Sequence, residues 1–206
     1  FHKYYQSWYE IIEELKVAYP SCILEGCAAG GMRCDIREVM TMDCSEMSDN
    51  TNPVALECFF EQGALRLPAY RLLKWFVVHP GPKLFCPPLN EWEESVVVPQ
   101  YQGSDLYTNL GTLPLPLICL LMISSNLSLS GNFLYLSDSQ KDTIKKYLQL
   151  YKTYRDMFRR GTLLLGHEPG TAGHPLPQQH IQYADCLADE HLVFAFSLAS
   201  NRDGYC

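Results

Sequence analysis

Two short stretches near the start of the chain gather residues that could do chemistry. Residues 27–35 read CAAGGMRCD, and residues 46–51 read EMSDNT. Paired glycines let the backbone approach a ligand where a Cβ atom would collide. A carboxyl group such as that of Asp49 can transfer a proton as a general acid or base. We therefore expect a binding or catalytic site to be built around these two stretches.

Each stretch follows a short apolar segment that is typical of a β-strand. Residues 22–27 form the first predicted strand, residues 33–38 a short helix, and residues 39–44 the second strand. Parallel α/β folds assemble their sites from polar side chains at the carboxyl ends of successive strands. The pattern therefore predicts that the two stretches lie side by side at one edge of a parallel sheet.

The two stretches together resemble motifs of glycoside hydrolase family 36, the retaining α-galactosidases. That family carries a Cys-Ser-Ser-Gly-Gly-Gly-Arg-x-Asp turn and, on a neighbouring strand, a Trp-Thr-Ser-Asp-Asn-Thr turn. The positions of this chain that match the two turns are Cys27, Gly30, Gly31, Arg33, Asp35, Ser48, Asp49, Asn50 and Thr51. The positions that depart from the family pattern are Ala28, Ala29, Met32, Glu46 and Met47.

The resemblance implies a role for each matching position. Asp49 corresponds to the acid/base, which protonates the glycosidic oxygen and later deprotonates the attacking water. The residues that would bind the galactose unit are Cys27, Gly30, Gly31, Arg33, Ser48 and Asn50. Two plainer interpretations stay open. Residues 48–51 could be an Asx turn that caps the next helix, and an Arg33–Asp35 ion pair could simply brace the first turn.

The second carboxylate that a retaining glycosidase needs is not found at its expected place. The family nucleophile is the Asp of a Lys-Trp-Asp turn, whereas Phe76 follows Lys74 and Trp75 here, and this segment comes after Asp49 instead of before it. The two carboxyl groups must lie about 5–5.5 Å apart on opposite faces of the sugar, which a same-strand neighbour such as Glu46 cannot achieve. We therefore expect a fragment that is inactive alone and that lacks the N-terminal half carrying the nucleophile.

The order of predicted elements agrees with this interpretation. A helix is followed by about four βα units up to residue 160, and short alternating strands come after it. The resemblance then implies an α/β fold: the second half of a TIM (β/α)8 barrel over residues 1–160, and the incomplete start of an antiparallel β-sandwich domain over residues 161–206. Half a barrel exposes two strand edges, so we expect this chain to pair with the missing half or to form oligomers through them.

Apolar periodicity and cap signals predict the remaining elements. Ser137 and Gln140 form a capping box that starts a long helix, and Gly161 ends it. Residues 79–94 form a proline-rich loop that we expect to be a lid or a wall of the site. Further helices are expected at residues 3–18 and 53–62, and further strands at residues 75–78, 96–98, 117–123, 162–165, 181–183 and 192–198.

Composition excludes several classes of protein. The chain has 206 residues and a net charge of −7, which argues against a general nucleic-acid surface. Its longest apolar run, residues 113–123, is too short for a membrane helix and contains Pro114 and Pro116. The nine cysteines include no C-x-x-C pair, which argues against a structural zinc site and favours reduced thiols in a cytoplasmic compartment.

The resemblance favours cleavage of terminal α-galactosides of oligosaccharides through a covalent galactosyl-enzyme, with no metal and no organic cofactor. Two alternatives share the fold. One is a degenerate member that binds carbohydrate without cleaving it, which the departures at Ala28, Ala29, Met32, Glu46 and Met47 allow. The other is a transglycosylase that makes raffinose-type sugars. The exact sugar, the linkage and the oligomeric state are left open by the sequence.

Overall fold

A parallel sheet whose strands follow one another in sequence order forms the first part of the molecule. The computed structural model describes residues 2–50, 53–78, 114–131, 133–171, 176–197, 200–201 and 204–205. The strands are parallel in the order β1-β2-β3-β4, and their bounds are β1 (Glu25–Gly26), β2 (Cys44–Glu46), β3 (Leu72–Val78) and β4 (Asn126–Gly131). β1 and β4 are therefore the two edges of this sheet within the described part of the chain.

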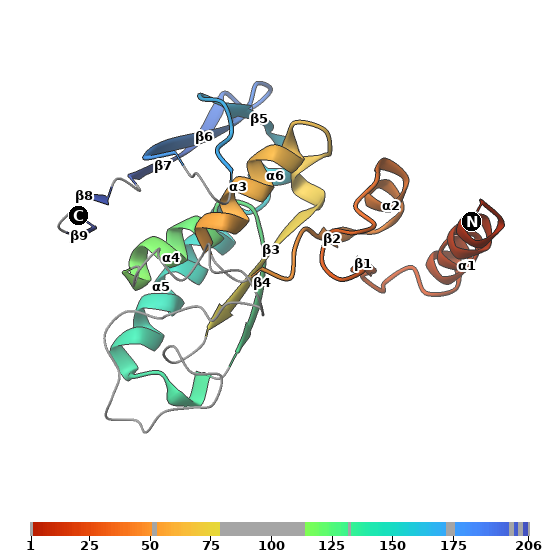
Figure 1. Ribbon diagram of the computed structural model, residues 1–206, viewed down its shortest axis with the longest axis horizontal. Coiled ribbons are helices and arrows are strands. Elements are labelled where there is room, and N and C mark those ends of the chain that lie inside the picture. Colours follow the sequence, from red (N-terminus) through yellow and green to blue (C-terminus); the bar gives the residue numbers. More distant parts are fainter. Residues whose placement is uncertain are drawn as a thin grey trace.

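Helices cover one side of the parallel sheet, and α3, α4 and α5 gather beside β3 and β4, whereas α1 stands at the far end of the molecule (Figure 1). The α-helices are α1 (His2–Ala18), α2 (Ile36–Thr41), α3 (Pro53–Ala64), α4 (Leu115–Met122), α5 (Asp138–Tyr154) and α6 (Met157–Arg160), with short 3₁₀ turns at Ala69–Arg71 and Phe133–Tyr135. No helix in the described ranges combines the length and the apolar character that crossing a membrane requires.

A separate antiparallel sheet follows, as the sequence predicts. Its order is β5-β6-β7, with β5 (Thr162–Leu165), β6 (Gln178–Asp185) and β7 (Glu190–Ser197), and a small pair is formed by β8 (Ser200–Asn201) and β9 (Gly204–Tyr205). Phe158 of α6 packs against Tyr183 and Phe194 of this sheet. The Tyr183 hydroxyl donates a hydrogen bond to the Ser124 carbonyl at 2.7 Å. The two sheets consequently share one apolar core.

Several predicted elements are confirmed. α1, α3 and β3 lie where periodicity placed them, and the capping box of Ser137 and Gln140 is complete in both directions. The apolar face of α1 is only partly covered, since Ile12 is buried while Ile11 is 52% exposed. The predicted strand at residues 96–98 and the predicted loop at residues 79–94 lie outside the described residues.

Other predictions are wrong, and helix signals explain two of them. Residues 117–123 are not a strand but most of α4, because Pro114 and Pro116 stand at its N-terminal end, where a missing N–H costs nothing. Residues 39–41 are the end of α2 instead of the start of a strand, because the Asp35 carboxylate caps that helix. α5 ends at Tyr154, and a separate α6 precedes Gly161. The first strand is confined to Glu25–Gly26.

A buried ion pair joins the parallel sheet to α3. Lys74 of β3 is fully buried, and its Nζ lies 2.7 Å from Oε2 of Glu57. The Ser124 hydroxyl donates to the same carboxylate oxygen at 2.9 Å, and Lys74 also donates to Ser124 and to the Leu121 carbonyl. Burial lowers the pKa of Lys74, and the Glu57 charge opposes that change. The pair therefore holds a charge that this core could not otherwise accept.

Removing one partner of this pair is expected to destabilise the fold strongly. Glu57→Gln leaves the Lys74 ammonium buried without a counter-charge, so the free energy of unfolding should fall by about 3–5 kcal/mol, measured by urea denaturation. The double variant Glu57→Leu with Lys74→Met should recover most of this loss. As a control, Asp138→Asn breaks an exposed 3.6 Å pair with Lys141 and should leave the free energy of unfolding nearly unchanged. Equal effects of Glu57→Gln and Asp138→Asn would contradict this account.

Candidate functional site

The two motif stretches, residues 27–35 and 46–51, are in contact, and two glycines make the contact possible. Gly30 has a φ of +68°, and a Cβ atom placed on it would lie 2.5 Å from the backbone nitrogen of Asp49. A Cβ atom on Gly31 would overlap the carbonyl oxygen of Met47. The first turn therefore approaches the backbone of the second turn at a distance that only glycine allows. The prediction that the two stretches lie side by side is confirmed.

Replacing Gly30 tests this contact. Gly30→Ala introduces a side chain at a left-handed φ and against backbone atoms that cannot move aside, so the protein should lose about 2 kcal/mol or more of unfolding free energy. Gly63→Ala is the matched control, since its Cβ would meet side-chain ends only, Leu72 Cδ1 at 3.1 Å and Met47 Sδ at 3.9 Å. Thermal denaturation of both variants measures the difference. A Gly30→Ala variant as stable as Gly63→Ala would disprove the close approach.

Arg33 and Asp35 act on different neighbours. The Arg33 guanidinium donates to the Tyr4 hydroxyl at 3.3 Å and lies 5.3 Å from the ring centre of Trp8, both on α1. Asp35 accepts hydrogen bonds from the backbone N–H groups of Arg37 and Glu38 and so caps α2. The suggested Arg33–Asp35 ion pair is not formed, and Arg33 instead fixes the first turn to α1.

The second turn is closed by a hydroxyl group. The backbone N–H of Asn50 donates to Ser48 Oγ at 3.1 Å. Asp49 is half-buried, and its carboxylate has no hydrogen bond or ion pair with another described residue. Cys27, which directly follows β1 and begins the first turn, is exposed. Thr51, the last position of the motif, lies outside the described residues.

The sequence marks Glu46 as a departure from the family pattern and as an unsuitable nucleophile, but it does not reveal how this side chain is buried. Glu46 ends β2, is 6% exposed, and its Oε1 has no hydrogen-bond partner. Burial, together with the nearby charges of Glu25 and Asp49, raises the pKa of Glu46 to about 8. Its carboxyl group is therefore protonated at neutral pH.

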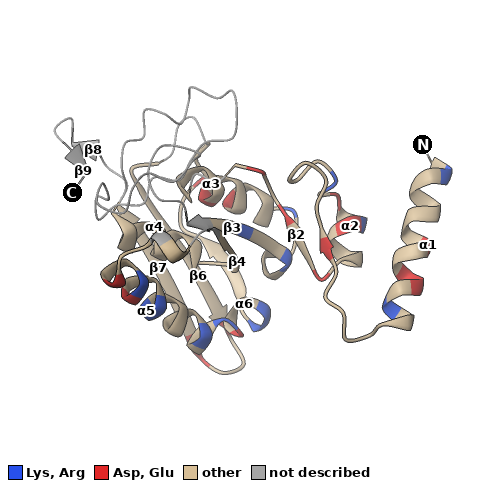
Figure 2. Ribbon diagram, turned by 90° about the horizontal axis from the view of Figure 1, so that it is seen from below, with Lys and Arg blue, Asp and Glu red and all other residues tan. Residues whose placement is uncertain are grey.

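Figure 2 shows acidic residues on β2 and α3, whereas basic residues gather on α5 and α6.

A titration checks the electrostatic link between Glu46 and Asp49. Carbon-13 NMR of the side-chain carboxyl of Glu46, assigned with Glu46→Gln, should give a midpoint near pH 8. Asp49→Asn removes one of the charges that disfavour ionisation, so the midpoint should fall. Asp142→Asn, at an exposed position on α5, should leave it unchanged. A wild-type midpoint near that of an ordinary glutamate, about 4.3, would refute the buried placement.

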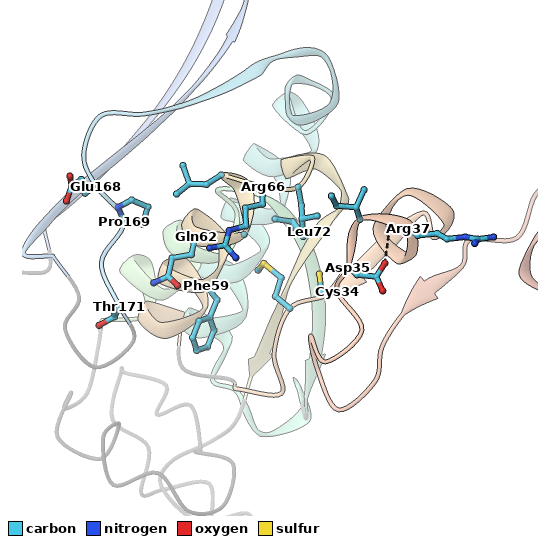
Figure 3. Close-up of a pocket in the computed structure, with 15 residues that line it drawn as sticks. Cys34, Asp35, Arg37, Phe59, Gln62, Arg66, Leu72, Glu168, Pro169 and Thr171 are labelled. Atoms are coloured by element: carbon cyan, nitrogen blue, oxygen red, sulfur yellow. Dashed lines mark hydrogen bonds between the residues drawn. The ribbon is translucent and has the colours of Figure 1, made fainter. Parts of the chain in front are cut away.

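A cavity beside α2 and α3 is a separate feature. It is an open groove of about 1210 Å³ between α2 and α3, and Asp49 does not line it. Figure 3 shows Phe59 and Gln62 of α3, with Arg66 of the turn that follows it, on one wall and Cys34 and Asp35 on the other. Within the described ranges, no group of three histidine, cysteine or carboxylate side chains could hold a metal ion, and the cysteines placed there are free thiols.

Comparisons with known proteins point to the family that the motifs suggest. Residues 1–70 match the family model described as melibiase. Over 55 residues, the chain is 42% identical to a curated alpha-galactosidase 1 of Pediococcus pentosaceus. The resemblance to glycoside hydrolase family 36 is confirmed. The family match includes both motif turns and ends before β3.

Solved α-galactosidases of family GH36 share the fold of nearly the whole chain. AgaB from Geobacillus stearothermophilus superimposes with a TM-score of 0.74 at 20% identity, over 95% of this chain and 23% of its own. A variant of AgaA from the same organism, in complex with raffinose, gives 0.73 at 18% identity over 99% and 24%. The α-galactosidase from Lactobacillus brevis gives 0.72 at 18% identity over 99% and 24%.

The chain spans only part of these relatives. It covers about a quarter of each solved chain and 8% of the Pediococcus protein. At these identities the solved structures establish the shared fold, an α/β unit with a parallel sheet and a separate antiparallel sheet. They do not assign a function to any individual residue of the site.

Proposed function

We propose that this chain forms the second half of the (β/α)8 barrel of a retaining α-galactosidase-like hydrolase, followed by the start of a β-sandwich domain. The contact of Gly30 and Gly31 with the turn at residues 47–49 carries the proposal. It aligns the two family motifs at the carboxyl ends of β1 and β2, where a parallel barrel places its catalytic groups. Within the described residues no further strand pairs with β1 or β4, which supports a missing first half, since a barrel has no edges.

Asp49 acts as the acid/base in this reaction. As the glycosidic bond breaks, a carboxylate from the missing half bonds to the anomeric carbon, and Asp49 donates its proton to the departing oxygen. Asp49 then takes a proton from water as this water attacks the covalent galactosyl-enzyme. Its half-buried carboxylate has no partner among the described residues, so nothing there competes for the proton it must give. Cys27, Ser48 and Asn50 would contact the hydroxyls of the galactose unit.

Hydrolysis of two α-galactosides by the whole protein tests the role of Asp49. Asp49→Asn should lower kcat/KM, which reports formation of the galactosyl-enzyme, by roughly 10²–10⁴-fold on raffinose, whose leaving group needs a proton. The loss should be smaller on 4-nitrophenyl α-galactoside, whose leaving group departs as the anion. Asp142→Asn should leave both rates unchanged. The 206-residue chain alone should release no nitrophenol, because it lacks a nucleophile.

Each other outcome has a defined meaning. Equal activity of Asp49→Asn and the wild type would exclude Asp49 as acid/base. Galactose binding without turnover by the whole wild-type protein would favour the non-catalytic carbohydrate-binding member. Turnover by the 206-residue chain that disappears in Asp49→Asn would show that the nucleophile lies within these residues and would contradict the half-barrel proposal.

A further inference from the structure

Glu46 is a buried carboxyl group with an unsatisfied hydrogen-bond acceptor. It is 6% exposed, and Oε1 has no hydrogen-bond partner. No Lys or Arg of the described residues pairs with it, although Lys74 of β3 compensates the buried Glu57 of α3. A buried polar atom without a partner costs stability. Such an atom calls for an explanation, and a role in binding a ligand is one.

The register of the sheet shows which way Glu46 faces. Glu25 pairs with Cys44 across β1 and β2, and Glu46 pairs with Leu73 of β3. Side chains of paired residues point to the same face, and residues two apart on a strand also share a face. Glu25, Cys44, Glu46 and Leu73 therefore lie on one face of the sheet.

The opposite face is the one that the helices cover. Leu72 belongs to the apolar core that the helices complete, and Lys74 reaches Glu57 on α3. Because Leu73 alternates with these two residues, Glu46 points away from the helices. In a barrel this is the interior face, and Glu46 stands at its carboxyl end, directly before the turn that carries Asp49.

We propose that Glu46 binds a hydroxyl group of the saccharide through Oε1 and so helps to select the sugar. This assignment rests on the function proposed above. A sugar hydroxyl supplies the donor that Oε1 lacks. A cation is a poorer ligand, because the described residues provide no set of three groups that could hold one. At this position the family pattern has a tryptophan, which offers no acceptor, so the contact belongs to this chain.

Binding of a donor to Oε1 has a consequence for protons. A hydrogen bond to the ionised carboxylate favours that form and lowers the pKa of Glu46 from about 8. The charged groups that act on Glu46 are Glu25 of β1 and Asp49 of the following turn, and both disfavour its ionisation. Sugar binding near pH 7.5 should therefore release a fraction of a proton, and the affinity should rise as the pH increases from 6 to 8.

Calorimetry of galactose binding to the whole protein, in buffers of different ionisation enthalpy, measures both effects. Galactose is used because it is a product and needs no turnover. Glu46→Gln is isosteric with the protonated acid, so it should fold normally, but it should abolish proton release and weaken binding about tenfold. Glu25→Gln, on the same face but exposed, should keep the affinity at pH 9 and shift proton release to lower pH.

Deoxy sugars identify the hydroxyl. Among galactose derivatives that each lack one hydroxyl, one should bind the wild type at least tenfold more weakly than galactose and bind Glu46→Gln as well as galactose does. Unchanged affinity and proton release in Glu46→Gln would overturn this assignment and leave the proposed α-galactosidase function standing. No binding of galactose and no turnover of α-galactosides by the wild type would overturn both.

Discussion

The close approach of one turn to the next is the constraint on which the candidate site depends. Gly30 and Gly31 have no Cβ atoms, and backbone atoms of residues 47–49 fill the space that these atoms would occupy. Without this contact the two motif turns would follow neighbouring strands but would not touch each other. Arg33 extends the same arrangement outward, because it ties the first turn to the side chains of α1. The two glycines are therefore needed to bring the two turns together, whether or not a ligand also approaches their backbone.

The helix-covered side of the parallel sheet carries charge as well as apolar side chains. Glu57 of α3 pairs with Lys74, and one turn later Glu61 lies 3.4 Å from His167, in the segment after β5. Burial, aided by the Glu57 charge, raises the pKa of Glu61 to about 8. Gln62 also donates to the Gly170 carbonyl at 2.6 Å. α3 thus connects the parallel sheet to the antiparallel one through polar contacts, which specify a single arrangement better than apolar packing would.

The sequence predicts most of the scaffold because its local signals agree with the final packing. Ser137 with Gln140 starts α5 as expected, and the adjacency of the motif turns follows from parallel strand order. The errors arise where one residue could serve two purposes. Asp35 reads equally well as the partner of Arg33 or as the cap of α2, and the second role wins because it satisfies two backbone N–H groups. The apolar segment at residues 115–122 was equally ambiguous, since apolar composition alone does not distinguish a buried strand from a buried helix.

Buried carboxyl groups lie on both faces of the parallel sheet, and their neighbours differ. On the helix-covered face, Lys74 and Ser124 compensate the Glu57 carboxylate, so that charge is part of the fold. On the other face, Glu46 is nearly as buried but has no cation beside it, only two more carboxylates. Sequence could not reveal this contrast, because a glutamate on a strand shows neither its burial nor its neighbours. Glu61 of α3 is also buried and has no hydrogen-bond partner, but His167 lies beside it, whereas Glu46 stands at the carboxyl end of β2 directly before Asp49. This position beside the candidate acid/base is what favours a ligand for Glu46.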